Sequence, residues 1–288
     1  MSKFKLILRD GRQMAWREYG KTSGGYAVVF AHGNLNSSLL QPSWDKTNDQ
    51  TESAGARVLA LDRPGYGDST AHTDRTYLDF AADVNELVTH LSISKFAVVG
   101  FSSGGPHALS CVAAALPGLI SCHLISSDAP YYKLGLNKQM YGKEDVTLEY
   151  SLKNAEKNCT AMIESYQSMS KPDRIEIAMA DIQHAIKNGL HGAASDSVLE
   201  AAPSWGFDLS GLNKIGPILS IWHGTDDHDV PIEAGNYLIE NLLGDGNINS
   251  DNRTHIIEGE NHTLIRRHWQ SILTEAVTLG NKYGEGKL

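Results

Sequence analysis

Short segments with the pattern of β-strands recur along the 288-residue chain, and stretches of helical spacing or Gly- and Pro-rich turns separate them. Continuously apolar segments of this length are typical of parallel strands that are covered on both faces. The first two segments flank Asp10-Gly11, a strong hairpin signal, so we expect the sheet to start antiparallel. The predicted strands are residues 4–8, 13–18, 26–31, 58–61, 96–99, 119–125, 217–222 and 253–257.

Helical spacing appears between these strands. Thr76 and Asp79 have the spacing of a capping box, and the apolar residues from Tyr77 to Leu91 that follow fall on one face of a helix. The apolar run 108–116 predicts another helix, with Pro106 in its first turn. Strands that alternate with helices predict an α/β fold with a parallel sheet.

The alternation stops after residue 125. Residues 131–205 have the pattern of helices without strands, one of them over 172–187, and an insertion of this length is usually a functional lid. We therefore expect a core formed by 1–129 and 208–288 and a helical cap over 130–207. Large side chains of the cap are expected mainly to pack it onto the core, with a pocket for an apolar substrate group as the alternative. They are Met140, Tyr141, Tyr150, Met162, Tyr166 and Met169.

Charge and composition limit the partners. The formal net charge is −9, and the basic residues are scattered, which argues against nucleic acid and anionic membranes as partners. No apolar run is long enough to span a bilayer. Neither oligomeric state nor a partner chain follows from the sequence.

Cysteine usage and the chain ends bear on the compartment. Cys111, Cys122 and Cys159 are widely spaced and odd in number, so we expect reduced structural thiols. The first residues run into a strand pattern without a signal peptide, which predicts a cytoplasmic protein. Gly286-Lys287-Leu288 resembles a peroxisomal address only loosely, because Gly replaces the usual small residue.

The strand over 96–99 leads into Gly100-Phe101-Ser102-Ser103-Gly104. This sequence matches G-x-S-x-G, in which the serine sits on a strained turn between a strand and a helix. The glycines leave room for that turn, and the following helix directs free N–H groups and a positive dipole end at the serine. Ser102 is therefore the candidate nucleophile.

A second motif with a predicted catalytic role follows the strand over 26–31. An oxyanion hole needs one backbone N–H after the nucleophile and another from the loop behind this early strand, and we assign them to Ser103 and Asn34. Gly33 would let that loop approach the site. The His32 side chain is interpreted as structural.

The last two predicted strands each end in a polar loop. The first loop holds Asp226, Asp227 and Asp229, and the second holds His262. Both leave the carboxyl ends of parallel strands, where Ser102 also emerges, so an acid and a base are expected to meet the serine. The order serine, aspartate, histidine is the order expected for this type of sheet. Spacing alone leaves the choice among the three aspartates open.

Together these motifs resemble the α/β-hydrolase superfamily, in its form with an inserted cap, over nearly the whole chain. The matching residues are the Asp10-Gly11-Arg12 hairpin, His32-Gly33-Asn34, Asp62-Arg63-Pro64-Gly65-Tyr66-Gly67-Asp68-Ser69, the Gly100 to Gly105 turn, Asp227 with Val230-Pro231, and His262.

The resemblance implies an eight-stranded, mostly parallel sheet with helices on both faces and a triad of Ser102, Asp227 and His262. It selects Asp227 because the acid of the family stands a few residues before Val-Pro, and it leaves Asp128 as the second choice. His255 lies within a strand and is expected to be structural.

The charged loop after the strand over 58–61 has a structural interpretation as well. Asp62, Arg63 and Asp68 are expected to brace their own loop through an ion pair and hydrogen bonds rather than to act on a substrate.

The predicted activity is that of a serine hydrolase acting on a carboxylic ester of small-molecule size, without a cofactor or metal. Haloalkane dehalogenases share the His-Gly-Asn loop but need a carboxylate nucleophile, as do epoxide hydrolases, and Ser102 argues against both. Lactone, thioester, amide and carbon–carbon substrates stay open, and so does a ligand receptor on this fold. A metallohydrolase built on His223, His228 and the neighbouring aspartates is disfavoured because the chain lacks H-x-H and H-E-x-x-H spacing.

Overall fold

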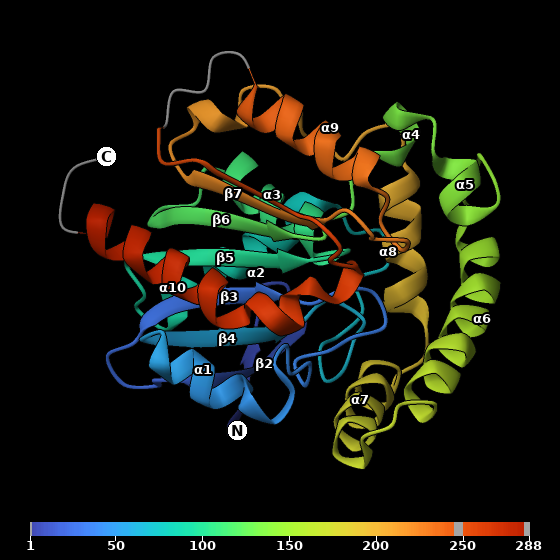
Figure 1. The fold of residues 1–288 in the computed structure, drawn as a ribbon, viewed down its shortest axis with the longest axis horizontal. Coiled ribbons are helices and arrows are strands. Elements are labelled where there is room, and N and C mark those ends of the chain that lie inside the picture. The colour runs from blue at the N-terminus through green and yellow to red at the C-terminus, as the bar shows by residue number, and fades with distance from the viewer. Residues whose placement is uncertain (1, 245–249, 285–288) are drawn as a thin grey trace.

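An eight-stranded sheet forms the centre of the molecule in the computed structural model, which describes residues 2–244 and 250–284 (Figure 1). The strand order is β1-β2-β4-β3-β5-β6-β7-β8. Only the pairs β1–β2 and β2–β4 are antiparallel, so the predicted hairpin start and the mostly parallel sheet are confirmed. The strands are β1 Ser2–Ile7, β2 Gln13–Gly20, β3 Tyr26–Ala31, β4 Ala56–Asp62, β5 Phe96–Phe101, β6 Leu119–Ile125, β7 Ile218–Gly224 and β8 Arg253–Ile257.

Helices cover both faces of this sheet because its central strands are apolar on both sides. In β3, Val28 and Phe30 face the layer of α1 and α10, whereas Val29 faces the layer of α2, α3 and α9 (Figure 1). The helices are α1 Thr47–Ser53, α2 Tyr77–His90, α3 Gly104–Ala113, α9 Ile232–Leu243 and α10 Ile265–Gly284, with the 3-10 turns η1 Trp44–Lys46, η2 Leu212–Lys214 and η3 His262–Leu264.

Two of these helices were expected from the sequence. The capping box of α2 is present, since the Thr76 hydroxyl accepts from the Asp79 N–H and the Asp79 carboxylate accepts from the Thr76 N–H. Helix α3 begins at Gly104, directly after the serine turn, and Pro106 lies in its first turn as expected. Its start there directs the first N–H groups of the helix to the turn.

The chain between β6 and β7 is helical and contains no strand from residue 131 to 205. Its helices α4 Tyr131–Leu134, α5 Asn137–Tyr141, α6 Leu148–Gln167, α7 Pro172–Ala185 and α8 His191–Ala201 lie beyond the end of the sheet to which the parallel strands point (Figure 1). Several of its large side chains pack as expected. Tyr166 is buried between the insertion and core loops, with Met162 and Met169 against the same cluster.

A buried ion pair attaches α8 to the core. Asp196 lies 2.7 Å from Arg63 Nη1 and 2.5 Å from Arg75 Nη2, and Tyr66 donates to the same carboxylate. The expectation of an ion pair within the loop of Arg63 is therefore wrong, whereas the expected hydrogen bonds within the loop are present between Asp62, Asp68 and Ser69. The arginine reaches α8 instead of the aspartates beside it.

Those aspartates also bind partners outside their loop. Asp62 accepts hydrogen bonds from the backbone N–H groups of Ser38 and Asp68 at 2.7 and 3.0 Å, and it lies 3.1 Å from His184 of α7. Asp68 forms ion pairs with lysines of β1 and of the chain just after α7. The loop thus connects the N-terminal hairpin with the insertion.

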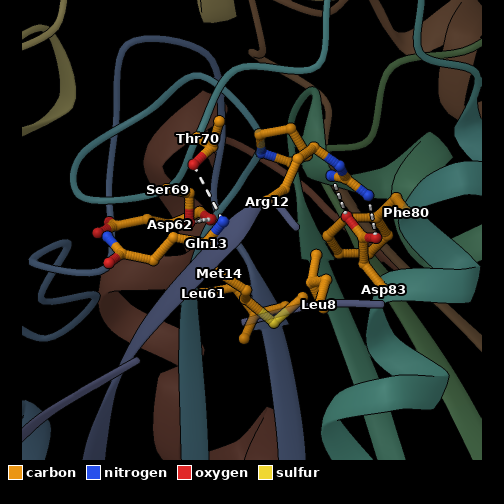
Figure 2. A pocket seen from close by; sticks show the side chains of 11 residues that line it. Leu8, Arg12, Gln13, Met14, Leu61, Asp62, Ser69, Thr70, Phe80 and Asp83 are labelled. Carbon is orange, nitrogen blue, oxygen red and sulfur yellow. Dashed lines mark hydrogen bonds and ion pairs between the residues drawn. The ribbon is translucent and has the colours of Figure 1, made fainter. Parts of the chain in front are cut away.

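A crevice under this loop is too small for a substrate. It lies between the Asp62 loop and the Arg12–Asp83 ion pair, with Ser69 and Gln13 nearby (Figure 2), and its volume is about 10 Å³. That volume corresponds to about one water molecule. The crevice is a packing feature of the hairpin.

Other observations bear on the compartment and on redox chemistry. Within residues 2–244 and 250–284, no helix has the length and apolar character needed to cross a bilayer. Cys111, Cys122 and Cys159 are buried free thiols. The segment Gly286-Lys287-Leu288 lies outside the described residues.

Candidate active site

Ser102 stands on a strained turn at the end of β5. Its φ is +53°, a left-handed conformation that costs free energy for a residue with a Cβ. The glycines around it are needed for close contact: a Cβ at Gly100 or Gly104 would clash with backbone oxygen atoms, and one at Gly105 would clash with Ser127. The turn is thus held under strain by tight packing, as the G-x-S-x-G pattern predicts.

The loop after β3 approaches this turn. A Cβ added at Gly33 would lie only 3.1 Å from the Cβ of Ser102, so the glycine permits this approach. In the described part of the chain, the backbone N–H groups of Asn34 and Ser103 have no protein acceptor. Free N–H groups next to a serine are what an oxyanion hole requires.

His262 and Asp227 meet at the same edge of the sheet. His262 Nδ1 lies 2.9 Å from Asp227 Oδ2, and the His262 ring is 5.1 Å from the ring of Phe101, the residue before Ser102. The other carboxylate oxygen of Asp227 accepts from the N–H groups of Asp229 and Val230 at 3.0 and 2.8 Å. These bonds orient the carboxylate toward the histidine.

The pKa values of this pair shift in opposite directions. Burial raises the pKa of Asp227, but the hydrogen bond and charge of His262 outweigh burial, and the result is a lowered pKa. Burial lowers the pKa of His262, and Asp227 more than compensates, so that the net pKa is raised. The pair therefore favours a charged carboxylate beside a histidine that is more basic than usual.

The other acids considered from the sequence lie differently. Asp226 is exposed and accepts from the Thr225 hydroxyl at 3.2 Å. Asp229 is exposed near His262 but forms no hydrogen bond with it. Asp128 is buried and accepts from the Tyr131 hydroxyl. Of these aspartates, Asp227 is the one that hydrogen-bonds to the histidine.

The remaining histidines considered from the sequence have structural contacts. His32 is fully buried between the Gly33 carbonyl and the Arg63 N–H, and burial lowers its pKa to about 3. His255 lies 2.9 Å from Glu275 and stacks on Trp222 at 3.7 Å. Neither ring is free to act on a substrate.

One group of metal-binding residue types overlaps the site. Asp227, Asp229 and His262 place one ligand atom each within 4.8 Å of one another. Both Asp227 oxygens and His262 Nδ1 are already engaged in the hydrogen bonds described above, so a metal would have to displace them. His223 instead lies 3.0 Å from the Val230 carbonyl.

Glu200, a buried carboxyl group beside the serine turn, was not singled out in the sequence, and it lies near Asp128, the second choice for the acid of the triad. Asp128 and Glu200 are 5% and 3% exposed, and the Tyr141 hydroxyl donates to Glu200 at 2.8 Å. Burial is the main cause of the raised pKa of both carboxyl groups. The charge of Asp128 raises the pKa of Glu200 further, whereas hydrogen bonds from the Ser103 hydroxyl and from a tyrosine oppose the shift of each group. This side of the site is thus lined by two buried carboxyl groups whose pKa values are raised.

The insertion holds the loop that carries Asn34. Asp181 of α7 accepts from the Ser37 N–H at 2.9 Å, from the Ser37 hydroxyl at 2.6 Å and from the Asn36 amide at 2.9 Å. The Asn34 amide donates to the Ala193 carbonyl of α8 at 3.1 Å. The signal for Asp181 was present in the sequence, since an acid stands on the apolar stripe of a predicted helix.

Comparison with known proteins agrees with the fold. The family profile described as the alpha/beta hydrolase fold matches residues 26–265. A non-heme chloroperoxidase of Streptomyces lividans is 27% identical over 269 residues, which cover 90% of this chain and 92% of that protein. An esterase from Exiguobacterium antarcticum superimposes with a TM-score of 0.72 at 20% identity, covering 95% of this chain and 98% of that chain. A bromoperoxidase from Bacillus anthracis superimposes with a TM-score of 0.67 at 21% identity, covering 98% of this chain and 100% of that one.

Proposed function

Because the chain belongs to the α/β-hydrolase family, we propose that it is a serine hydrolase that cleaves a carboxylic ester through an acyl-enzyme on Ser102. The observation that carries this proposal is the 2.9 Å contact between His262 Nδ1 and Asp227 beside the strained serine turn. Among the described residues, the second nitrogen of His262 has no hydrogen-bond partner, and a histidine held by a carboxylate in this way has the arrangement of a general base.

In the proposed reaction, Nε2 of His262 takes the hydroxyl proton of Ser102 as its oxygen attacks the ester carbonyl. The bond to the alcohol then breaks, and the same proton passes to the departing alkoxide. A water molecule repeats the two transfers, releases the acid and restores Ser102. Asp227 keeps the histidine in the required tautomer and stabilises its charged form.

The carbonyl oxygen becomes negatively charged in each tetrahedral intermediate. We assign its stabilisation to the backbone N–H groups of Asn34 and Ser103, which have no protein acceptor in the described chain. Removing one donor of this kind typically costs about a hundredfold or more in turnover.

The helices between β6 and β7 are proposed to form a cap over 130–207, with the core formed by 1–129 and 208–288. Support comes from the hydrogen bonds of Asp181 and Ala193 to the Asn34 loop, since these place α7 and α8 next to the proposed oxyanion hole. Such a cap would limit the substrate to a small molecule that fits beneath it.

The test is labelling with a fluorophosphonate probe, followed by intact-mass measurement and an assay with p-nitrophenyl esters. Wild-type protein should gain one adduct, and Ser102→Ala should gain none and lose ester hydrolysis; Ser103→Ala retains the N–H and is the matched control. Hydrolysis that survives in Ser102→Ala would contradict the proposal. Lactone, thioester and amide substrates in the same panel distinguish the acyl classes, and hydrogen peroxide with bromide tests the activity that the names of the peroxidase relatives suggest.

A further inference from the structure

A second pocket lies outside the serine turn, between the core and the connection from α6 to α7. Its volume is about 240 Å³, and it is lined by Trp44, Met169, Ser170, Lys171 and Arg174. A volume of this size equals the liquid volume of about eight water molecules, which is enough for a small organic ligand.

Positive charge is concentrated around the indole of Trp44. The guanidinium carbon of Arg266 is 3.7 Å from the centre of the Trp44 ring, and that of Arg174 is 5.2 Å from it. Lys171 and Arg174 are cations of the lining itself, and Arg266 lies beside the pocket against the Trp44 ring. This concentration stands out in a chain whose formal net charge is −9.

These three cations lack acidic partners. Among the residues that the structure describes, no Asp or Glu oxygen lies within 4.0 Å of Lys171, Arg174 or Arg266, although the neighbouring Arg267 pairs with Glu260 at 2.8 Å. Arg266 donates one weak hydrogen bond, to the Gln41 carbonyl at 3.4 Å. Several guanidinium donors around the pocket are therefore available to a ligand.

Like charges held close together also favour an anion. Burial lowers the pKa of Arg266, and the nearby charge of Arg174 lowers it further, against the opposing effects of Tyr166 and Asp181. An anion between the two guanidinium groups would relieve this repulsion, and a carboxylate matches their planar donor geometry. Trp44 and Met169 provide apolar surface for the rest of the ligand.

We propose that this pocket binds a small carboxylate with a flat apolar body, its charge between Arg174 and Arg266 and its body against Trp44. The occupant touches both segments that lead to the proposed catalytic groups. Trp44 ends the loop that begins with Asn34, and Arg266 lies one helical turn after His262. The carboxylate belongs either to the substrate or to a free ligand, and the two sources can be separated by experiment.

The experiment is isothermal titration calorimetry with benzoate, compared with the neutral benzamide. Benzoate should bind to wild type, and Arg174→Gln should weaken its binding by about tenfold or more, since a charge-assisted hydrogen bond is lost. Lys157→Gln removes the same charge from an exposed position on α6 and should leave the affinity unchanged. Equal affinity in Arg174→Gln, equal binding of benzamide, or no heat from benzoate at millimolar concentration would overturn the proposal.

Hydrolysis of p-nitrophenyl butyrate and p-nitrophenyl hydrogen succinate shows whether the bound carboxylate belongs to the substrate or to a free ligand. If the pocket holds the carboxylate of the substrate, Arg174→Gln raises KM for the succinate ester and not for the butyrate ester. If it holds a free ligand, the two esters respond alike to the substitution. Calorimetry needs no turnover, so its result does not depend on the proposed hydrolase activity.

Discussion

Helices α7 and α8 each send one buried carboxylate from the insertion into the core, but the two carboxylates meet opposite surroundings. Asp196 of α8 contacts Arg63 and Arg75 at 2.7 and 2.5 Å. Asp181 of α7 contacts only neutral donors, on Asn36 and Ser37. One attachment is therefore an ion pair, and the other is a set of hydrogen bonds to an uncharged loop.

This difference appears in the pKa values. Burial raises the pKa of Asp196, but the two arginines outweigh it, so the pKa is lowered. Burial of Asp181 is only partly offset by its hydrogen bonds, and its pKa rises to about 7. The two regions show that an insertion can be fixed to a core by one contact that keeps its charge near neutral pH and by another that titrates there.

The largest effect is expected from Asp196→Asn, which leaves two arginines buried without a counter-charge. Loss of one partner of a buried ion pair costs about 3–5 kcal/mol of unfolding free energy. Urea denaturation measures this loss. Glu149→Gln is the control, because it breaks an exposed pair with Lys153 on α6 and should cost about 0.5 kcal/mol or less. A loss below about 1 kcal/mol for Asp196→Asn would show that the ion pair does not hold α8.

A smaller effect on stability but a clear effect on turnover is expected from Asp181→Asn. The new amide has a single acceptor oxygen and cannot accept from both Ser37 and the Asn36 amide, so the loop that carries Asn34 should shift. Displacement of a catalytic group by about 1 Å can cost up to about a hundredfold in rate, so kcat should fall while KM changes little. Asp173→Asn, on an exposed turn of α7, is the matched control. Unchanged kcat in Asp181→Asn would separate α7 from the proposed oxyanion hole.

The smallest expected effect per measured step is the change in stability from one pH unit to the next. The pKa of Asp181 is higher in the folded chain, about 7, than its ordinary value of 3.8, so the folded state holds this proton more tightly. Its contribution to stability is therefore greatest below about pH 4 and is lost as the pH rises to about 7, with a slope of at most about 1.4 kcal/mol per pH unit. Asp196, with its lowered pKa, stays charged throughout this window.

Denaturation curves of wild type and Asp181→Asn between pH 5 and 8 provide the check. The stability of wild type should fall relative to the variant as the pH rises. Parallel curves would mean that Asp181 is already charged at pH 5 in the folded protein, which contradicts its raised pKa.

The sequence predicted the elements whose cause is local. Strands β3, β6 and β8 have the expected bounds because polar or turn residues follow each of them directly. Helices α9 and α10 were not among the expected elements, although Pro231 before α9 is a helix start signal. Their apolar stripes are interrupted by polar residues and are less conspicuous than a continuous apolar run.

The residues of the candidate site also fall into a group that local motifs predict and a group that they do not. The positions of Ser102, Asp227 and His262 follow from motifs at strand ends, where the topology of the sheet brings the loops together. The contacts of Asp196 with Arg63, and of Asp181 with Ser37, join segments far apart in the chain, and no local pattern identifies such partners. A charged residue on an apolar helix face shows only that a partner exists.

The three cysteines are distributed between the insertion and the core. Cys159 is 6% exposed in the cluster where α6 and α7 meet the core loops, whereas Cys111 and Cys122 are fully buried beside the sheet. Because a thiol must be exposed before it is alkylated, modification of Cys159 reports how often the insertion separates from the core. Modification of the other two reports opening of the core itself, so one reagent measures the opening rates of both regions in the unmodified sequence.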